Sequence, residues 1–161
     1  MAELTQLEEK LAEVMGLAQA AQGSTSKVAK LVDDEQVSGT LERMGQEAKE
    51  TEERCAKLAD SIEGKKTAIV EKARETKQEA EAMMGDYLGD DVDALDGLEF
   101  LIMAEAGELG HVEIVGAMNE ELGEQPVREL VEWALPVQRR HFEQTRDAAL
   151  ELARREAAEV G

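Results

Sequence analysis

Apolar residues recur at alternating steps of three and four along most of this 161-residue chain. That spacing places them on one side of an α-helix, whereas a half-buried strand needs an apolar residue at every second position. Two such stripes follow one another in the first 62 residues. They run through Leu4, Leu7, Leu11, Val14, Ala18, Ala21, Thr25, Val28 and Val32, and through Val37, Leu41, Met44, Ala48, Thr51, Cys55, Leu58 and Ile62. The pattern predicts amphipathic helices and no sheet.

Capping and turn residues predict where the helices begin and end. Asp33-Asp34 is typical of a cap and turn between the first two helices, and Gly64 is typical of the end of the second. A fourth helix is predicted from Asp93 or Ala94 to about residue 122, where Gly123 would end it. The last helix is predicted over about 126–158, opened by a proline.

The segment between Gly64 and the turn-rich run 89–93 has only a weak apolar pattern. We expect a short surface helix there, which carries the chain back along the other helices. Four long amphipathic helices and one short crossover helix predict an all-α fold, a ferritin-like four-helix bundle of two antiparallel hairpins. With 161 residues, the chain is long enough for a single domain over residues 1–161.

Charge and composition exclude several classes of function. The 37 acidic and 18 basic residues give a net charge of −19, which argues against binding to nucleic acid or to an anionic membrane. Cys55 is the only cysteine, so no intrachain disulfide can form, as is usual in the cytoplasm. The first residues do not resemble a signal peptide, and no apolar run of about 18 residues predicts a transmembrane helix.

The most informative chemical motif is Glu108-x-x-His111, which places a carboxylate and an imidazole on one face of a helix. Apolar residues lie one heptad away on either side of Glu108, His111 and also His141 in the last helix. All three side chains are therefore predicted to point inward. A glutamate and two histidines are suitable ligands for iron or zinc.

Two interpretations of this cluster stay open. Glu108, His111 and His141 either bind one metal ion, or form a buried polar cluster in which Glu108 accepts a hydrogen bond from a histidine. A dinuclear site would need carboxylates from all four bundle helices. The first stripe contains none, and Gln138 stands where the last helix would need one, which argues against an oxidative di-iron centre.

Several short motifs resemble the YciE/YciF-type ferritin-like proteins. Gly110-His111-Val112-Glu113-Ile114, followed by Glu121-Leu122-Gly123, is similar to the Glu-His-aromatic-Glu-Ile and Ala-x-x-Leu-Gly motifs of their third bundle helix. Glu50-Thr51 is similar to their His-x-x-Glu-Thr element, with Glu47 in place of the histidine. Asp93-Ala94-Leu95-Asp96 matches the end of the crossover in position. The resemblance covers most of the chain.

The chain departs from this family at ligand positions. Gly110 replaces a glutamate, a Glu-Glu pair is lost near Gln138-Arg139, and a tyrosine is missing. The resemblance implies a small bacterial bundle, linked to stress responses and often dimeric. We expect a cytoplasmic homodimer that is structural or stress-associated, is not an enzyme, needs no cofactor and has largely lost its metal site. The alternatives are a mononuclear iron or zinc protein using Glu108, His111 and His141, and a helix-mediated module that binds a protein or ligand.

Overall fold

The computed structural model describes residues 2–160, and every regular element in them is an α-helix. The five helices are α1 (Gln6–Ala29), α2 (Glu35–Ser61), α3 (Lys66–Tyr87), α4 (Ala94–Leu122) and α5 (Gln125–Val160). The expectation of an all-α fold is therefore confirmed. None of the five helices is both long and apolar enough to cross a lipid bilayer.

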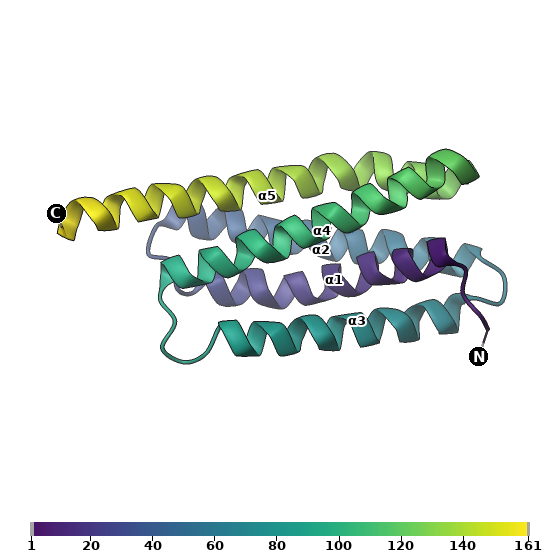
Figure 1. Cartoon of the computed structure of the whole chain (residues 1–161), viewed down its shortest axis with the longest axis horizontal. Coiled ribbons are helices and arrows are strands. Elements are labelled where there is room, and N and C mark those ends of the chain that lie inside the picture. The colour runs from purple at the N-terminus through teal and green to yellow at the C-terminus, as the bar shows by residue number, and fades with distance from the viewer. Residues whose placement is uncertain (1, 161) are drawn as a thin grey trace.

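Four of the helices form a ring in which each packs on two neighbours. Helix α1 contacts α2 and α4, and α5 contacts the same two helices from the other side. Helices α1 and α5 run in one direction and α2 and α4 in the other, so neighbours in the ring are antiparallel (Figure 1). The chain forms two hairpins, α1–α2 and α4–α5, and α3 connects them.

Helix α3 is 22 residues long and packs along α1, so the prediction of a short helix is wrong. It does lie on the surface, because only Ala68, Ile69 and Ala73 are buried. The contact uses small side chains. Ala73 of α3 is completely buried, and a Cβ atom on Gly16 of α1 would lie only 2.4 Å from the Ala73 carbonyl oxygen. Because the two backbones approach this closely, few large apolar residues are needed, and the stripe is faint in the sequence.

The ends of the helices follow from local chemistry. Thr5 begins α1 with a capping box, and the side chains of Asp34 and Asp93 cap α2 and α4 by accepting backbone hydrogen bonds. Gly123 ends α4 with a left-handed backbone at φ +68°, which a residue without Cβ adopts at little cost. The predicted cap at Asp33-Asp34 and the predicted bounds of α4 are confirmed.

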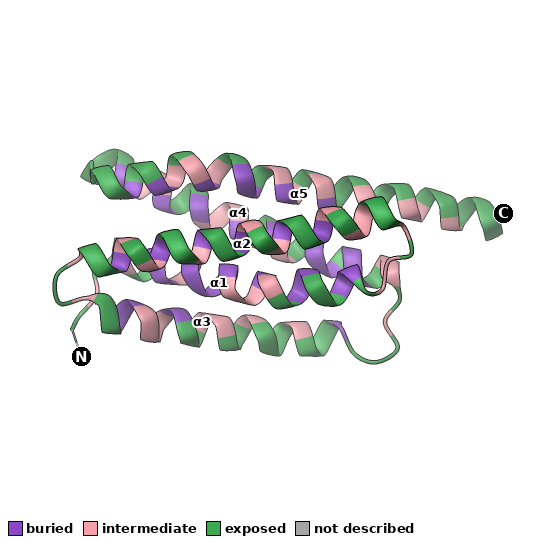
Figure 2. Cartoon of the chain, turned by 180° about the vertical axis from the view of Figure 1, so that it is seen from behind, coloured by how far each residue is buried: buried purple, intermediate pink, exposed green. Residues whose placement is uncertain are grey.

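The core has two large apolar clusters, one towards each end of the ring, and a small third one formed by Ala12, Ala59 and Ile69 of α1, α2 and α3. The buried faces of the helices point at one another (Figure 2). One large cluster combines the first half of α1 with the beginning of α5, and the other combines the end of α1 with the beginnings of α2 and α4. On each of α2, α4 and α5, polar residues lie in the sequence between the residues of one large cluster and the residues of the other. We call this set the polar layer: Glu47, Glu105, Glu108, Gln138 and His141.

Candidate functional site

Two glutamates of α4 form the centre of the polar layer. Glu105 and Glu108 lie three residues apart, both are buried, and their carboxyl groups are hydrogen-bonded to each other. Burial and the adjacent Glu105 raise the pKa of Glu108 well above its usual value. Burial also raises the pKa of Glu105, against the opposing effects of His141 and of two hydrogen bonds. Glu108 therefore keeps its proton to higher pH than an exposed glutamate does, and its protonated carboxyl can donate to Glu105.

Helix α5 supplies the partners of Glu105. Gln138 donates a hydrogen bond from its Nε2 to a carboxylate oxygen of Glu105. Nδ1 of His141 lies 3.9 Å from the same carboxylate, and the exposed fractions of Glu105 and His141 are only 1% and 2%. Gln138 and His141 are one turn apart on α5, as Glu105 and Glu108 are on α4, so the two pairs face each other across the helix contact.

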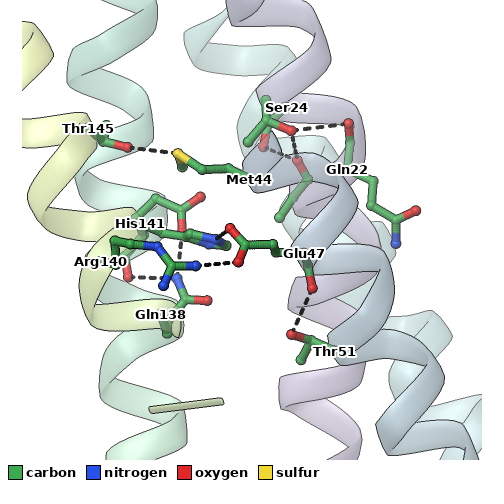
Figure 3. Close-up of polar contacts among 12 residues, drawn as sticks. Gln22, Ser24, Met44, Glu47, Thr51, Gln138, Arg140, His141 and Thr145 are labelled. Carbon is green, nitrogen blue, oxygen red and sulfur yellow. Dashed lines mark hydrogen bonds and ion pairs between the residues drawn. The ribbon is translucent and has the colours of Figure 1, made fainter. Parts of the chain in front are cut away.

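Glu47 of α2 completes the layer on its third side. Its Oε1 lies 3.1 Å from Nε2 of His141, and its other oxygen accepts a hydrogen bond from the guanidinium of Arg140 (Figure 3). Burial alone would raise the pKa of Glu47, but the hydrogen bonds from Arg140 and His141 outweigh it and hold that pKa below its usual value. His141 is thus held between two glutamates from different helices.

His111 lies outside the polar layer. Its Nδ1 is 2.8 Å from the carbonyl oxygen of Gly107, its Nε2 is 3.3 Å from a carboxylate oxygen of Glu13 on α1, and its side chain is partly exposed. Of the three predicted ligands, the structure places Glu108 and His141 in the layer and His111 elsewhere. Across residues 2–160, no three His, Cys, Asp or Glu side chains are grouped so that they could hold a metal ion.

The structure contains a buried polar cluster, but its pairing differs from the predicted one, in which a histidine donates to Glu108. Glu108 pairs with Glu105 and not with a histidine. Glu105 could have been found, because Leu98 and Val112, one heptad away on either side, are both buried apolar residues. Glu47 lies on the flank of its apolar stripe, and only its long side chain brings its carboxylate to His141. The spacing of apolar residues along a helix does not indicate how far a side chain on the flank extends.

In their present arrangement, the side chains of the polar layer do not fit a metal ion. Carboxylates and an imidazole are the right ligand types for iron or zinc. Here, however, an amide N–H of Gln138 is directed at Glu105 and a guanidinium is bound to Glu47. The raised pKa of Glu108 also favours a proton on the Glu105–Glu108 pair. A metal ion would have to displace all three. Among buried side-chain atoms of the described chain, only Gln144 Oε1 lacks a hydrogen-bond partner.

Inside the bundle, little space is left beside the layer, although Glu108 also borders a groove of about 290 Å³ on the surface between α3 and α4. A cavity of about 10 Å³ is lined by Thr51, Glu108 and Gln138 together with apolar residues of α1, α4 and α5. This volume is about that of one probe sphere, so it holds a single water molecule at most. The thiol of Cys55, one turn beyond Thr51 on α2, is buried, and burial raises its pKa to about 12, which removes its nucleophilic form at neutral pH.

Comparison with known proteins gave no relative. No protein-family model matches this chain, and neither a curated protein nor a solved structure matches it.

Proposed function

We propose that this chain is a ferritin-like helical-bundle protein without enzymatic activity, with a structural or stress-associated role in the cytoplasm. The topology supports this proposal, because two antiparallel hairpins joined by one long connection are typical of ferritin-like folds. The motifs around His111 and Glu50-Thr51 support it from the sequence. The proposed homodimer rests on the resemblance alone, and sedimentation of the purified protein tests it.

One observation carries the non-enzymatic proposal: the polar groups at the centre of the bundle bind one another. Substrate chemistry needs a reacting group that a substrate can reach. Glu105, Glu108 and His141 are buried and their partners are other side chains, and the internal cavity beside them has only about 10 Å³. Only Glu108, which is 8% exposed, also borders a surface groove, between α3 and α4. A layer of this kind contributes to stability and joins α2, α4 and α5 through hydrogen bonds across the core.

Metal analysis tests this proposal, and the two histidines provide matched variants. We expect protein purified without chelator to contain no stoichiometric iron or zinc, and its melting temperature to be the same with and without EDTA. His141→Ala should be destabilised because it removes the buried imidazole that lies between Glu47 and Glu105. His111→Ala should change stability little, since that side chain is partly exposed.

The alternative, a mononuclear iron or zinc protein, makes the opposite prediction. One bound ion per chain that is lost in both His111→Ala and His141→Ala would refute the proposal and favour the ligand set Glu108, His111 and His141. One bound ion per chain that is lost only in His141→Ala would place the metal in the polar layer. That result would also refute the proposal of a protein without a metal site.

A further inference from the structure

An apolar groove runs between α3 and α4, with α1 as its floor. It has a volume of about 290 Å³. Met83, Met84 and Tyr87 of α3 form one wall, Phe100 and Met103 of α4 form the other, and small residues of α1 close the bottom. The groove exists because α3 packs on α1 and leaves its other side free.

Three of the seven exposed large apolar residues in the described part of the chain line the walls of the groove. The side chains of Met83, Tyr87 and Met103 are 57%, 55% and 52% exposed, although the chain has few large apolar residues. The rings of Tyr87 and Phe100 lie 5.9 Å apart and connect the two walls at one end. Methionine side chains are flexible and polarisable, so a wall of methionines can adapt to apolar side chains of different shapes.

The walls of the groove are strongly acidic, although Lys27 of α1 donates to the carbonyl oxygen of Leu88 and Lys77 of α3 pairs with Glu81. Residues 78–127, which include the lining part of α3 and all of α4, contain 14 of the 37 acidic residues and none of the 18 Lys and Arg residues. Most of the net charge of −19 therefore lies in less than a third of the chain. A negative field over an apolar groove attracts a partner that is both apolar and cationic.

We propose that this groove binds a basic amphipathic helix of a partner protein. The lining residues span positions 80–87 of α3 and 100–111 of α4, which corresponds to about two to three turns of a docked helix. The volume is about twice that of a cavity that accepts benzene, so it takes about two large apolar anchors. Such a helix presents its anchors at i, i+3, i+4 or i+7 and its Lys and Arg residues towards the acidic walls.

The same observations disfavour other occupants. A second copy docked through this face would bring two regions without any Lys or Arg into contact, and the like charges would repel. A fatty acid or phospholipid would carry its anionic head group into the same field. Glu108 of the polar layer and His111 also line the groove. The proposal nevertheless goes beyond the proposed function, because a docked helix would use the apolar walls and does not depend on the pairing of Glu108 with Glu105.

Three fluorescent peptides of about 14 residues, long enough to cover the groove, test the proposal directly. The first has Leu at helical anchor spacing and Lys elsewhere, the second has Glu in place of Lys, and the third has the first composition in scrambled order. We expect the basic amphipathic peptide to bind at least about tenfold more tightly than either control, by fluorescence anisotropy. Its affinity should fall when salt is raised from about 0.05 M to about 0.5 M. Equal binding of all three peptides would overturn the proposal.

Matched variants locate the binding surface. Met103→Lys removes an apolar contact and adds a positive charge that repels the basic peptide. It should lower the affinity for this peptide at least about tenfold. Leu150→Lys makes the same change at a 45%-exposed position on α5 outside the groove, and should leave the affinity unchanged. Tyr87→Lys repeats the test on the opposite wall, and far-UV circular dichroism checks that each variant folds. Equal effects of Met103→Lys and Leu150→Lys would refute the groove as the site.

Two further outcomes would also overturn the proposal. If no peptide binds and sedimentation detects a dimer that Met103→Lys dissociates but Leu150→Lys does not, the groove belongs to a second copy of this chain. If no peptide binds but a neutral alkyl alcohol does, and Met103→Lys prevents it, the groove is a site for small apolar ligands.

Discussion

Replacing Gly16 with alanine tests the close contact of α1 with α3, on which the position of the whole third helix depends. A Cβ atom at Gly16 would lie 2.4 Å from the carbonyl oxygen of Ala73 and 2.7 Å from Cβ of Thr76, whereas ordinary contacts begin at 3.4 Å. The nearest atom belongs to the backbone and cannot rotate away. Helix α3 must therefore move by about 1 Å or lose part of its packing.

The expected change in stability is the sum of two opposing effects. Alanine favours an α-helix over glycine by about 1 kcal/mol. Overpacking of a close contact costs about 1–3 kcal/mol, and the upper end applies where the backbone is the obstacle. We therefore expect Gly16→Ala to lower the free energy of unfolding by about 2 kcal/mol.

Gly23→Ala is the matched control, because Gly23 lies on the same helix and no atom lies within 4 Å of its Cβ position. It should raise the free energy of unfolding by up to about 1 kcal/mol. Urea-induced unfolding, followed by far-UV circular dichroism, measures both variants. If Gly16→Ala is as stabilising as Gly23→Ala, the helices do not touch at Gly16, and the placement of α3 is refuted.

Three further predictions concern the interior. Burial and the adjacent Glu105 raise the pKa of Glu108, so its protonated form stabilises the fold at low pH, and this contribution is lost as pH rises from the usual glutamate range through the raised pKa. In urea unfolding, the free energy of unfolding of Glu108→Gln should therefore fall less with rising pH than that of the unmodified protein. Parallel curves for the two proteins would contradict this prediction. Cys55, with a pKa raised by burial to about 12, should react with a thiol reagent only after the protein unfolds, and fast labelling of the native protein would show that the thiol is accessible. Asn119 exchanges two hydrogen bonds of 2.9 Å with the backbone of Glu124 in the turn between α4 and α5, so Asn119→Ala should lower the free energy of unfolding by about 1–3 kcal/mol; no loss would mean that water replaces these bonds.

Most helix bounds could be predicted from the sequence because local groups determine them. Asp34 and Asp93 cap the helices that follow them, and the left-handed Gly123 ends α4, without help from distant residues. The length of α3 could not be predicted in the same way. Its burial depends on Gly16, more than 50 residues away, which removes a side chain so that Ala73 can approach.

The site could be predicted only in part, for a related reason. His141 was correctly predicted to point inward, because α5 has a distinct apolar face. Helix α4 is apolar on nearly all sides, so its heptads do not distinguish inner from outer positions. For that reason His111 was predicted inside although it contacts Glu13, and Glu105 was overlooked although it is the most buried carboxylate.

The polar layer also determines how the helices can slide along one another. The core has almost no aromatic residues and consists of similar Leu, Val, Ala and Met side chains, which would pack nearly as well after a shift of one turn, about 5.4 Å. A one-turn shift of α5 towards the beginning of α4 would move Gln138 and His141 away from Glu105 and place them against Leu101. The carboxyl pair would then be buried without its partners. A chain with so uniform a core thus has a single favourable alignment of its helices, and five polar side chains select it.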